Sequence, residues 1–211
     1  PRERDGKVLP FVAQGRINLA SAHIAQGLEL SGAHLQGDPT APENTALAGW
    51  WLRVDGDFLA QEWASEQGQA LPFRCDGVLS LVSATIAQKA RIILAPAATP
   101  HALVLADACI GGGLEITVGN QPIEARGLRV ANESSIGSSA AQAASDVDLT
   151  FAKFGPSLFF GGGLRSIQLA AASGNSLVCL DGQTAPRQVV LREARFTNTI
   201  HLRVQHTLDL T

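Results

Sequence analysis

The stretch of sequence that decides the fold spans residues 17–35 and reads INLASAHIAQGLELSGAHL. It has an apolar, a polar and an apolar residue at Ile17–Leu19, and the same pattern returns at Leu28–Leu30, 11 residues later. A second pair of triplets, Ala22–Ile24 and Ala33–Leu35, repeats with the same shift. No helix has this period, whereas alternation of apolar and polar side chains is typical of short β-strands.

The same pattern recurs along the rest of the chain. The triplets Leu103–Leu105 and Leu114–Ile116 are again 11 residues apart, with Ala108–Ile110 between them. Short strands joined by small corner residues every five or six positions wind a coil with four short sides. One coil would use about 21 or 22 residues, and it must stack on the next coil to bury its core. We therefore expect a single all-β domain over residues 1–211, a four-sided parallel β-helix.

Three segments interrupt the strand pattern and are predicted to be loops that leave the coil. They are residues 37–46, residues 61–72 around Trp63, and the Ser- and Ala-rich residues 131–146. The last segment shows no strand alternation, and a short helix is the alternative interpretation for it. None of the three is long enough to separate two domains.

Composition excludes several classes of protein. The chain is 45% hydrophobic and 17% charged with a net charge of −3, and its aromatic residues, 5% of the total, are all Phe or Trp. Few aromatic residues favour a narrow aliphatic interior. Because Lys and Arg do not cluster, we expect no direct binding of nucleic acid.

The same composition bears on location and completeness. No apolar stretch reaches the length of a membrane-spanning helix. Three cysteines, an odd number, in a chain with no secretory signal fit a reducing compartment, so a cytoplasmic location is expected, with peripheral membrane association left open. The 211 residues contain no Met, and we therefore expect the chain to be a segment of a longer protein.

The sequence predicts no catalytic, cofactor-binding or metal-binding residue. The triplets Gly111–Gly113 and Gly161–Gly163 precede strands rather than helices, so they do not form phosphate-binding loops. His23 and His34 are half a turn apart in a four-sided coil and should point to opposite faces. Asp55 and Asp57 flank a glycine and indicate a turn, with a weak calcium site as the alternative.

The tryptophans are the candidate partner-binding residues. Trp50 and Trp51 are adjacent, and neighbouring strand residues point to opposite sides, so both cannot face a narrow interior. At least one of the two rings therefore points outward. Either residues 61–72 fold back and cover that ring, or the ring is an anchor for a partner. The candidate surface therefore consists of Trp50, Trp51 and Trp63.

Three phrases of the sequence carry a resemblance to a known family. They are FRCDGVLSLVSATI at residues 73–86, GLELSGAHL at residues 27–35 and LRVDGDF at residues 52–58. They resemble the bacterial pentapeptide-like β-solenoid repeat proteins. The resemblance implies a right-handed parallel β-helix. Some members of that group are labelled membrane-associated oxidoreductases, but the present sequence contains no recognisable cofactor motif.

Together these observations predict a non-catalytic structural or protein-interaction module whose partner is a protein, either another domain, a second copy or an unrelated chain. Three alternatives remain: a carbohydrate-active β-helix enzyme, a pentapeptide-type inhibitor that mimics DNA, and a self-assembling scaffold. The enzyme would need two or more acids and a basic residue beside one groove. The scaffold would stack through the open ends of the coil.

Overall fold

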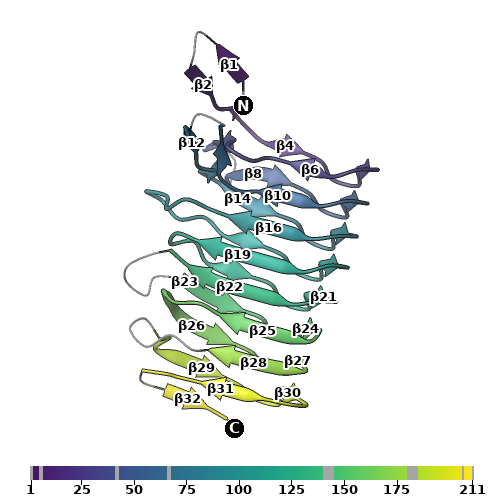
Figure 1. Cartoon of the computed structure of the whole chain (residues 1–211), viewed down its shortest axis with the longest axis vertical. Coiled ribbons are helices and arrows are strands. Elements are labelled where there is room, and N and C mark those ends of the chain that lie inside the picture. The colour runs from purple at the N-terminus through teal and green to yellow at the C-terminus, as the bar shows by residue number, and fades with distance from the viewer. Residues whose placement is uncertain are drawn as a thin grey trace.

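The computed structural model describes residues 2–4, 7–40, 43–65, 68–139, 145–179, 185–205 and 207–210. Within these ranges there is no helix, and short strands stack along one long axis from the N-terminus to the C-terminus (Figure 1). The described strands pair in parallel, except in two hairpins. The all-β fold class and the stacked parallel coils are therefore confirmed.

Three long parallel sheets, here called sheets I, II and III, form the sides of the rod. Sheet I consists of β4 (Ile17–Asn18), β8 (Thr45–Ala48), β14 (Val78–Ser80), β17 (Leu103–Val104), β20 (Ile123–Glu124), β23 (Ser145–Asp148), β26 (Leu164–Gln168), β29 (Gln188–Val190) and β32 (Thr207–Asp209). Sheet II consists of β5 (His23–Ile24), β9 (Arg53–Val54), β15 (Thr85–Ile86), β18 (Cys109–Ile110), β21 (Arg129–Val130), β24 (Lys153–Phe154), β27 (Ser173–Gly174) and β30 (Arg195–Phe196). Sheet III consists of β6 (Leu28–Glu29), β10 (Phe58–Ala60), β16 (Ala90–Ile93), β19 (Leu114–Val118), β22 (Ser134–Ser138), β25 (Ser157–Phe160), β28 (Ser176–Cys179) and β31 (Ile200–Leu202).

A fourth side carries strands only near the N-terminus. Sheet IV pairs β3 (Val12–Ala13), β7 (His34–Leu35) and β13 (Arg74–Cys75), and the described residues after β13 add no strand to it. Pro96, Pro100 and Pro122 lie on the later return segments, and a proline has no N–H to donate to a ladder. The coil is therefore four-stranded at first and three-stranded afterwards.

The side chain of Gln121 replaces part of the missing ladder. Gln121 is almost fully buried; its Nε2 donates to the Ala95 carbonyl at 2.9 Å, and its Oε1 accepts the Gly119 N–H at 2.8 Å. These bonds satisfy backbone groups that a regular strand would have paired. They also tie two successive coils together on the side that has lost its sheet.

Hairpins are the two departures from parallel pairing. Strands β1 (Arg2–Arg4) and β2 (Lys7–Leu9) pair at the N-terminal end of the rod (Figure 1). Strands β11 (Trp63–Ala64) and β12 (Ala70–Leu71) pair inside residues 61–72. The predicted loop at 61–72 does leave the coil, but it does so as a hairpin.

The segment 131–146 corrects the sequence prediction. Residues 134–138 form β22, which pairs in register with β19 and β25, and residues 145–148 form β23; residues 140–144 lie outside the described part. The strand was not recognised because its inward positions include a serine instead of a large apolar residue: Ser134 pairs with Leu114 and Leu158. Ladder pairing on both sides overrides the weak local pattern.

The interior is narrow and mainly aliphatic, as the composition predicted. In the two-residue strands of sheet II the first side chain generally points outward and the second inward; Arg53 is exposed and Val54 fully buried. Leu81, Leu105, Leu149 and Leu169 are each fully buried and occupy the same position in their coils. Stacks of this kind bury each coil against the next, which is why the rod needs many coils.

Ser134 should weaken this core. Its side chain is 1% exposed, and its Oγ has no hydrogen-bond partner among the described residues. We expect Ser134→Ala to raise the free energy of unfolding by about 1 kcal/mol, because the variant no longer buries an unpaired hydroxyl. Urea titration measures this change. Ser135→Ala, on the exposed side of the same strand, should stay within about 0.5 kcal/mol of wild type, and a loss of stability in Ser134→Ala would contradict the prediction.

Candidate functional site

The turn between sheets I and II repeats in every described coil and creates a line of equivalent positions, here called the corner line. Its members are Ser21, Trp51, Ser83, Asp107, Gly127, Phe151, Ala171 and Glu193, and all of them have φ between 53° and 68°. The amide of each member from Ser21 to Ala171 donates to a carbonyl of the next coil, as from Trp51 to Val82 at 3.0 Å. The turn itself is closed by a bond such as that from Leu52 N–H to Gly49 O at 3.2 Å.

Two of these positions hold large exposed aromatic rings. Trp51 and Phe151 are each 65% exposed. They lie four coils apart on the same line, which corresponds to about 19 Å. A positive φ is unfavourable for bulky residues, so these rings occupy strained positions and make few contacts with their own chain.

The three candidate tryptophans do not form one surface. Trp50 is half-buried, and its indole Nε1–H donates to Ser80 Oγ at 2.8 Å, which is a structural role. Trp51 is the outward ring that the sequence required. Trp63 is half-buried on the hairpin strand β11, which follows sheet III in the chain. Of the three, Trp51 is the one whose ring is largely exposed on the surface of the rod.

Phe151 was not among the candidates predicted from the sequence, which were all tryptophans. Phe151, Phe154, Phe159 and Phe160 are close in the chain, but Phe154 and Phe160 are buried whereas Phe151 is exposed. The available signal was the repeat itself: Trp51 precedes Arg53 by two residues, as Phe151 precedes Lys153. Aligning the coils on their buried residues would have placed the two rings at equivalent positions.

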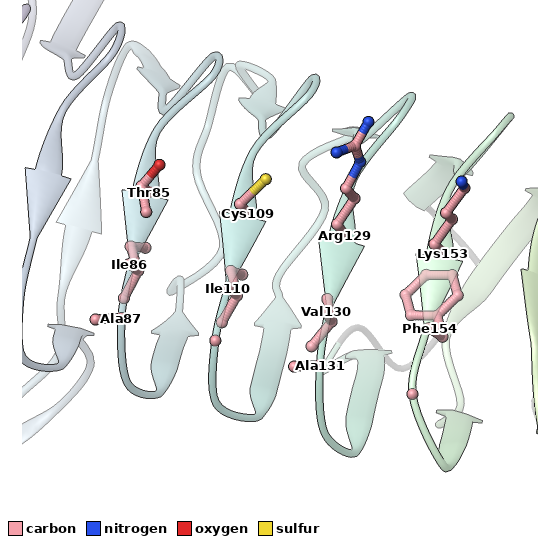
Figure 2. Close-up of a pocket in the computed structure, with 12 residues that line it drawn as sticks. Thr85, Ile86, Ala87, Cys109, Ile110, Arg129, Val130, Ala131, Lys153 and Phe154 are labelled. Atoms are coloured by element: carbon pink, nitrogen blue, oxygen red, sulfur yellow. The ribbon is translucent and has the colours of Figure 1, made fainter.

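Beside the corner line lies the outward ladder of sheet II. Its members are His23, Arg53, Thr85, Cys109, Arg129, Lys153, Ser173 and Arg195. Figure 2 shows the central members Thr85, Cys109, Arg129 and Lys153 pointing to the same side of four successive coils. The ladder contains no carboxylate.

A shallow groove of about 370 Å³, here called the sheet II groove, runs across these coils. Four of its lining residues, Ala87, Gly111, Ala131 and Gly155, come from the turn that follows each sheet II strand. All four are very small, so the groove stays open along the rod. Arg129 and Lys153 line the same groove and are its only charged lining residues in the described part of the chain.

Histidine–aspartate pairs link successive coils near the N-terminus. His23 Nε2 lies 2.7 Å from Asp55 Oδ2, and His34 Nε2 lies 2.5 Å from Asp76 Oδ2. His23 is on sheet II and His34 on sheet IV, so the prediction that they point to different faces is confirmed. In both pairs the aspartate follows an arginine by two residues and reaches back to the histidine of the preceding coil.

Asp55 also accepts a hydrogen bond from Arg53 Nε at 2.8 Å. Hydrogen bonds from Arg53 and His23 lower the pKa of the Asp55 carboxyl. It is therefore an ionised acceptor at neutral pH that links Arg53 to His23 of the preceding coil.

Several other cations are paired from coil to coil. On the sheet I side, Arg126 Nε lies 2.5 Å from Asp148 Oδ2, Arg192 pairs with Asp209 at 2.8 Å, and Arg165 pairs with Asp146. On sheet III, Lys89 Nζ and Arg91 Nε lie 2.9 Å and 3.1 Å from Glu115 Oε2. Although burial raises the pKa of Glu115, the hydrogen bond and charge of Lys89, with the charge of Arg91, lower it on balance.

Sheet II places three exposed cations on one outward ladder. Arg129, Lys153 and Arg195 are exposed, and no described carboxylate lies within ion-pair distance of them. The nearest acids in sequence are Glu133, four residues after Arg129, Asp148, five residues before Lys153, and Glu193, two residues before Arg195. This face thus presents unpaired positive charge on a chain whose net charge is −3.

Cys109 is the accessible thiol in the groove. Cys75 and Cys179 are buried, whereas Cys109 is half-buried. Burial raises the pKa of the Cys75 thiol to about 12, so it holds almost no reactive thiolate at neutral pH.

We expect a thiol reagent at about pH 8 to modify Cys109 alone in the folded protein and all three cysteines after unfolding, because only the thiolate of an accessible cysteine reacts. Intact-mass spectrometry counts the adducts. Cys109→Ser is the control and should leave the folded protein unmodified. Rapid modification of Cys75 in the folded protein would show that the core opens near β13.

Comparison with protein-family models, with curated proteins and with solved structures returned no match for this chain. The described residues also include no helix that is long and apolar enough to cross a membrane.

Proposed function

We propose that the chain is a non-catalytic protein-interaction module whose contact surface is the corner line together with the sheet II face. One observation carries the proposal: Trp51 and Phe151 are each 65% exposed at equivalent, left-handed positions of the rod. The equivalent positions in other coils hold small or polar residues such as Ser21, Ser83 and Ala171. Because the rings bring little to the core, contact with a partner is the role that accounts for them.

The β-helix supplies rigidity to this surface. Every strand of sheet II from β9 to β27 is paired on both sides, so its backbone groups are already satisfied. Recognition must therefore come from side chains, and a fixed spacing between coils holds those side chains in place.

The test replaces both rings by serine, because serine already stands on the corner line at Ser21 and Ser83. Proteins retained by the immobilised chain are identified and purified, and each is titrated against wild type and against the double variant Trp51→Ser/Phe151→Ser. We expect the double variant to bind its partner at least about 10-fold more weakly, because exposed aromatic rings dominate such interfaces. Its free energy of unfolding should change by no more than about 0.5 kcal/mol.

Ala171→Ser, on the same corner line, is the matched control and should bind as wild type. The proposal fails if the double variant binds the purified partner with unchanged affinity. Light scattering over a concentration series covers the case in which the partner is a second copy. Association that persists in the double variant would then favour contacts through the terminal coils, where Phe11, Ile200 and Leu210 are exposed.

One observation favours an enzyme as the second candidate. A groove of about 530 Å³ on sheet III is lined by two acids and a base, Glu115, Glu133 and Lys89, beside the exposed ring of Phe159. A glycoside hydrolase needs one acid that is protonated at the working pH. The lowered pKa of Glu115 makes it unsuited to that role, which leaves Glu133. Release of reducing ends from polysaccharides, abolished in Glu133→Gln, would support this candidate.

A further inference from the structure

We propose that the sheet II face binds an extended acidic segment of a protein partner, held by Arg129, Lys153 and Arg195. The inference rests on the proposed function and names the chemistry of the partner. The three cations carry it, because they lie on one ladder with no described carboxylate within ion-pair distance. By contrast, Arg126 and Arg192 beside sheet I and Lys89 beside sheet III contact carboxylates of adjacent coils. A row of exposed cations without acids is electrostatically complementary to carboxylates supplied from outside.

The spacing of the ladder fits a short extended segment. Arg129 and Lys153 are register partners on adjacent coils, and Arg195 lies two coils beyond Lys153. The three cations thus span about 14 Å along the rod, which is the length of about five residues of extended chain. The long Arg and Lys side chains absorb the difference between the coil spacing and the spacing of carboxylates on the peptide.

The sheet II groove lies beside Arg129 and Lys153 and continues toward Thr85, so it accepts the part of the segment that extends past Arg129. Its wall positions are Ala87, Gly111, Ala131 and Gly155, so a backbone with small apolar side chains can lie against them. At the other edge of the same strand, Phe151 stands two residues before Lys153. The face therefore offers apolar contact on both sides of a central positive row, which suits acidic residues interspersed with apolar ones.

Other polyanions fit this face less well. Nucleic acid binding relies on many phosphate contacts, whereas this row has three unpaired cations on a chain of net charge −3. A polysaccharide would require hydrogen-bonding side chains for its hydroxyls, and the groove is lined chiefly by apolar residues. A peptide is the ligand class that uses both the charges and the apolar walls.

The experiment titrates the full chain into a fluorescein-labelled peptide of alternating glutamate and valine and follows fluorescence anisotropy. We expect binding that weakens as salt rises towards about 0.15 M. The double variant Arg129→Gln/Lys153→Gln should bind at least about 10-fold more weakly, because it removes two charge-assisted contacts. Both side chains are exposed, so the variant should fold normally, and circular dichroism checks this.

The matched control is Arg126→Gln/Arg165→Gln, which removes the same charge from arginines already paired with Asp148 and Asp146. It should change affinity by no more than about twofold. If both double variants lost the same affinity for the peptide, binding would depend on net charge alone, and the proposal would be overturned. Absence of peptide binding would also overturn it, as would tighter binding of duplex DNA or a polyuronate than of the peptide.

Cys109 provides an independent readout, since it lies between Thr85 and Arg129 on the ladder (Figure 2). Bound peptide should slow its alkylation several-fold in wild type and leave it unchanged in Arg129→Gln/Lys153→Gln. Failure of the acidic-peptide proposal can be told apart from failure of the proposal that the chain is a protein-interaction module. If a purified partner still loses affinity in Trp51→Ser/Phe151→Ser but no acidic peptide binds, the module stands and only the acidic chemistry is wrong.

Discussion

The variant Gly155→Ala is expected to lose about 3 kcal/mol of unfolding free energy. A Cβ at this position would lie 2.1 Å from the carbonyl oxygen of Ala131 in the preceding coil. The obstacle is backbone, which is held by ladder pairing of β21 with β24 and cannot rotate aside as a side chain would. Either the two coils separate locally or the sheet II groove is distorted.

Guanidinium unfolding followed by circular dichroism measures the loss. The control is Gly161→Ala, whose Cβ would meet its nearest neighbour, the Cα of Gly137, at an ordinary 3.5 Å. That variant should lose less than about 1 kcal/mol. Equal stability of the two variants would mean that close approach of the coils at Gly155 is not what requires glycine there.

Leu149→Ala is expected to cost about 3–4 kcal/mol, since it removes a fully buried side chain from the middle of the leucine stack and leaves a cavity. The neighbouring coils hold their own side chains in register and cannot collapse into the space. The same measurement of the free energy of unfolding applies.

The chain contains its own control for this variant. Leu210 occupies the equivalent position in the last described coil but is 64% exposed, so Leu210→Ala should change stability by no more than about 0.5 kcal/mol. A small loss at Leu149 would show that the stack is loosely packed. A large loss at Leu210 would show that the terminal coil is covered by something in solution.

Sequence periodicity predicted the fold well because it reports on local geometry. The triplets at residues 17–19 and 28–30 become β4 and β6 with their outer residues turned inward, and the interior is narrow and aliphatic. Where an inward position holds serine, as in β22, the periodic signal disappears and the strand was predicted as a loop or helix. The strand forms nevertheless, because β22 pairs in parallel with β19 on one side and β25 on the other.

The candidate site was predicted only in part. Adjacency of Trp50 and Trp51 required one ring to leave the interior, and Trp51 does so. Adjacency gave no information about Phe151, which lies on the same corner line but 100 residues further along the chain. Trp63 was grouped with the others by residue type, and the fold places it on a separate hairpin.

The sequence by itself determined the strand alternation, the turns and the narrow core, because each depends on residues a few positions apart. Only the tertiary structure decided which charges are paired. The partners of Lys89 and Arg192 lie 26 and 17 residues away, distances set by the lengths of the intervening loops. Register partners on sheet I are 20 residues apart at Leu103 and Ile123 but 32 apart at Leu47 and Leu79. Because coil length varies in this way, the unpaired positive row on sheet II becomes visible only when the coils are stacked.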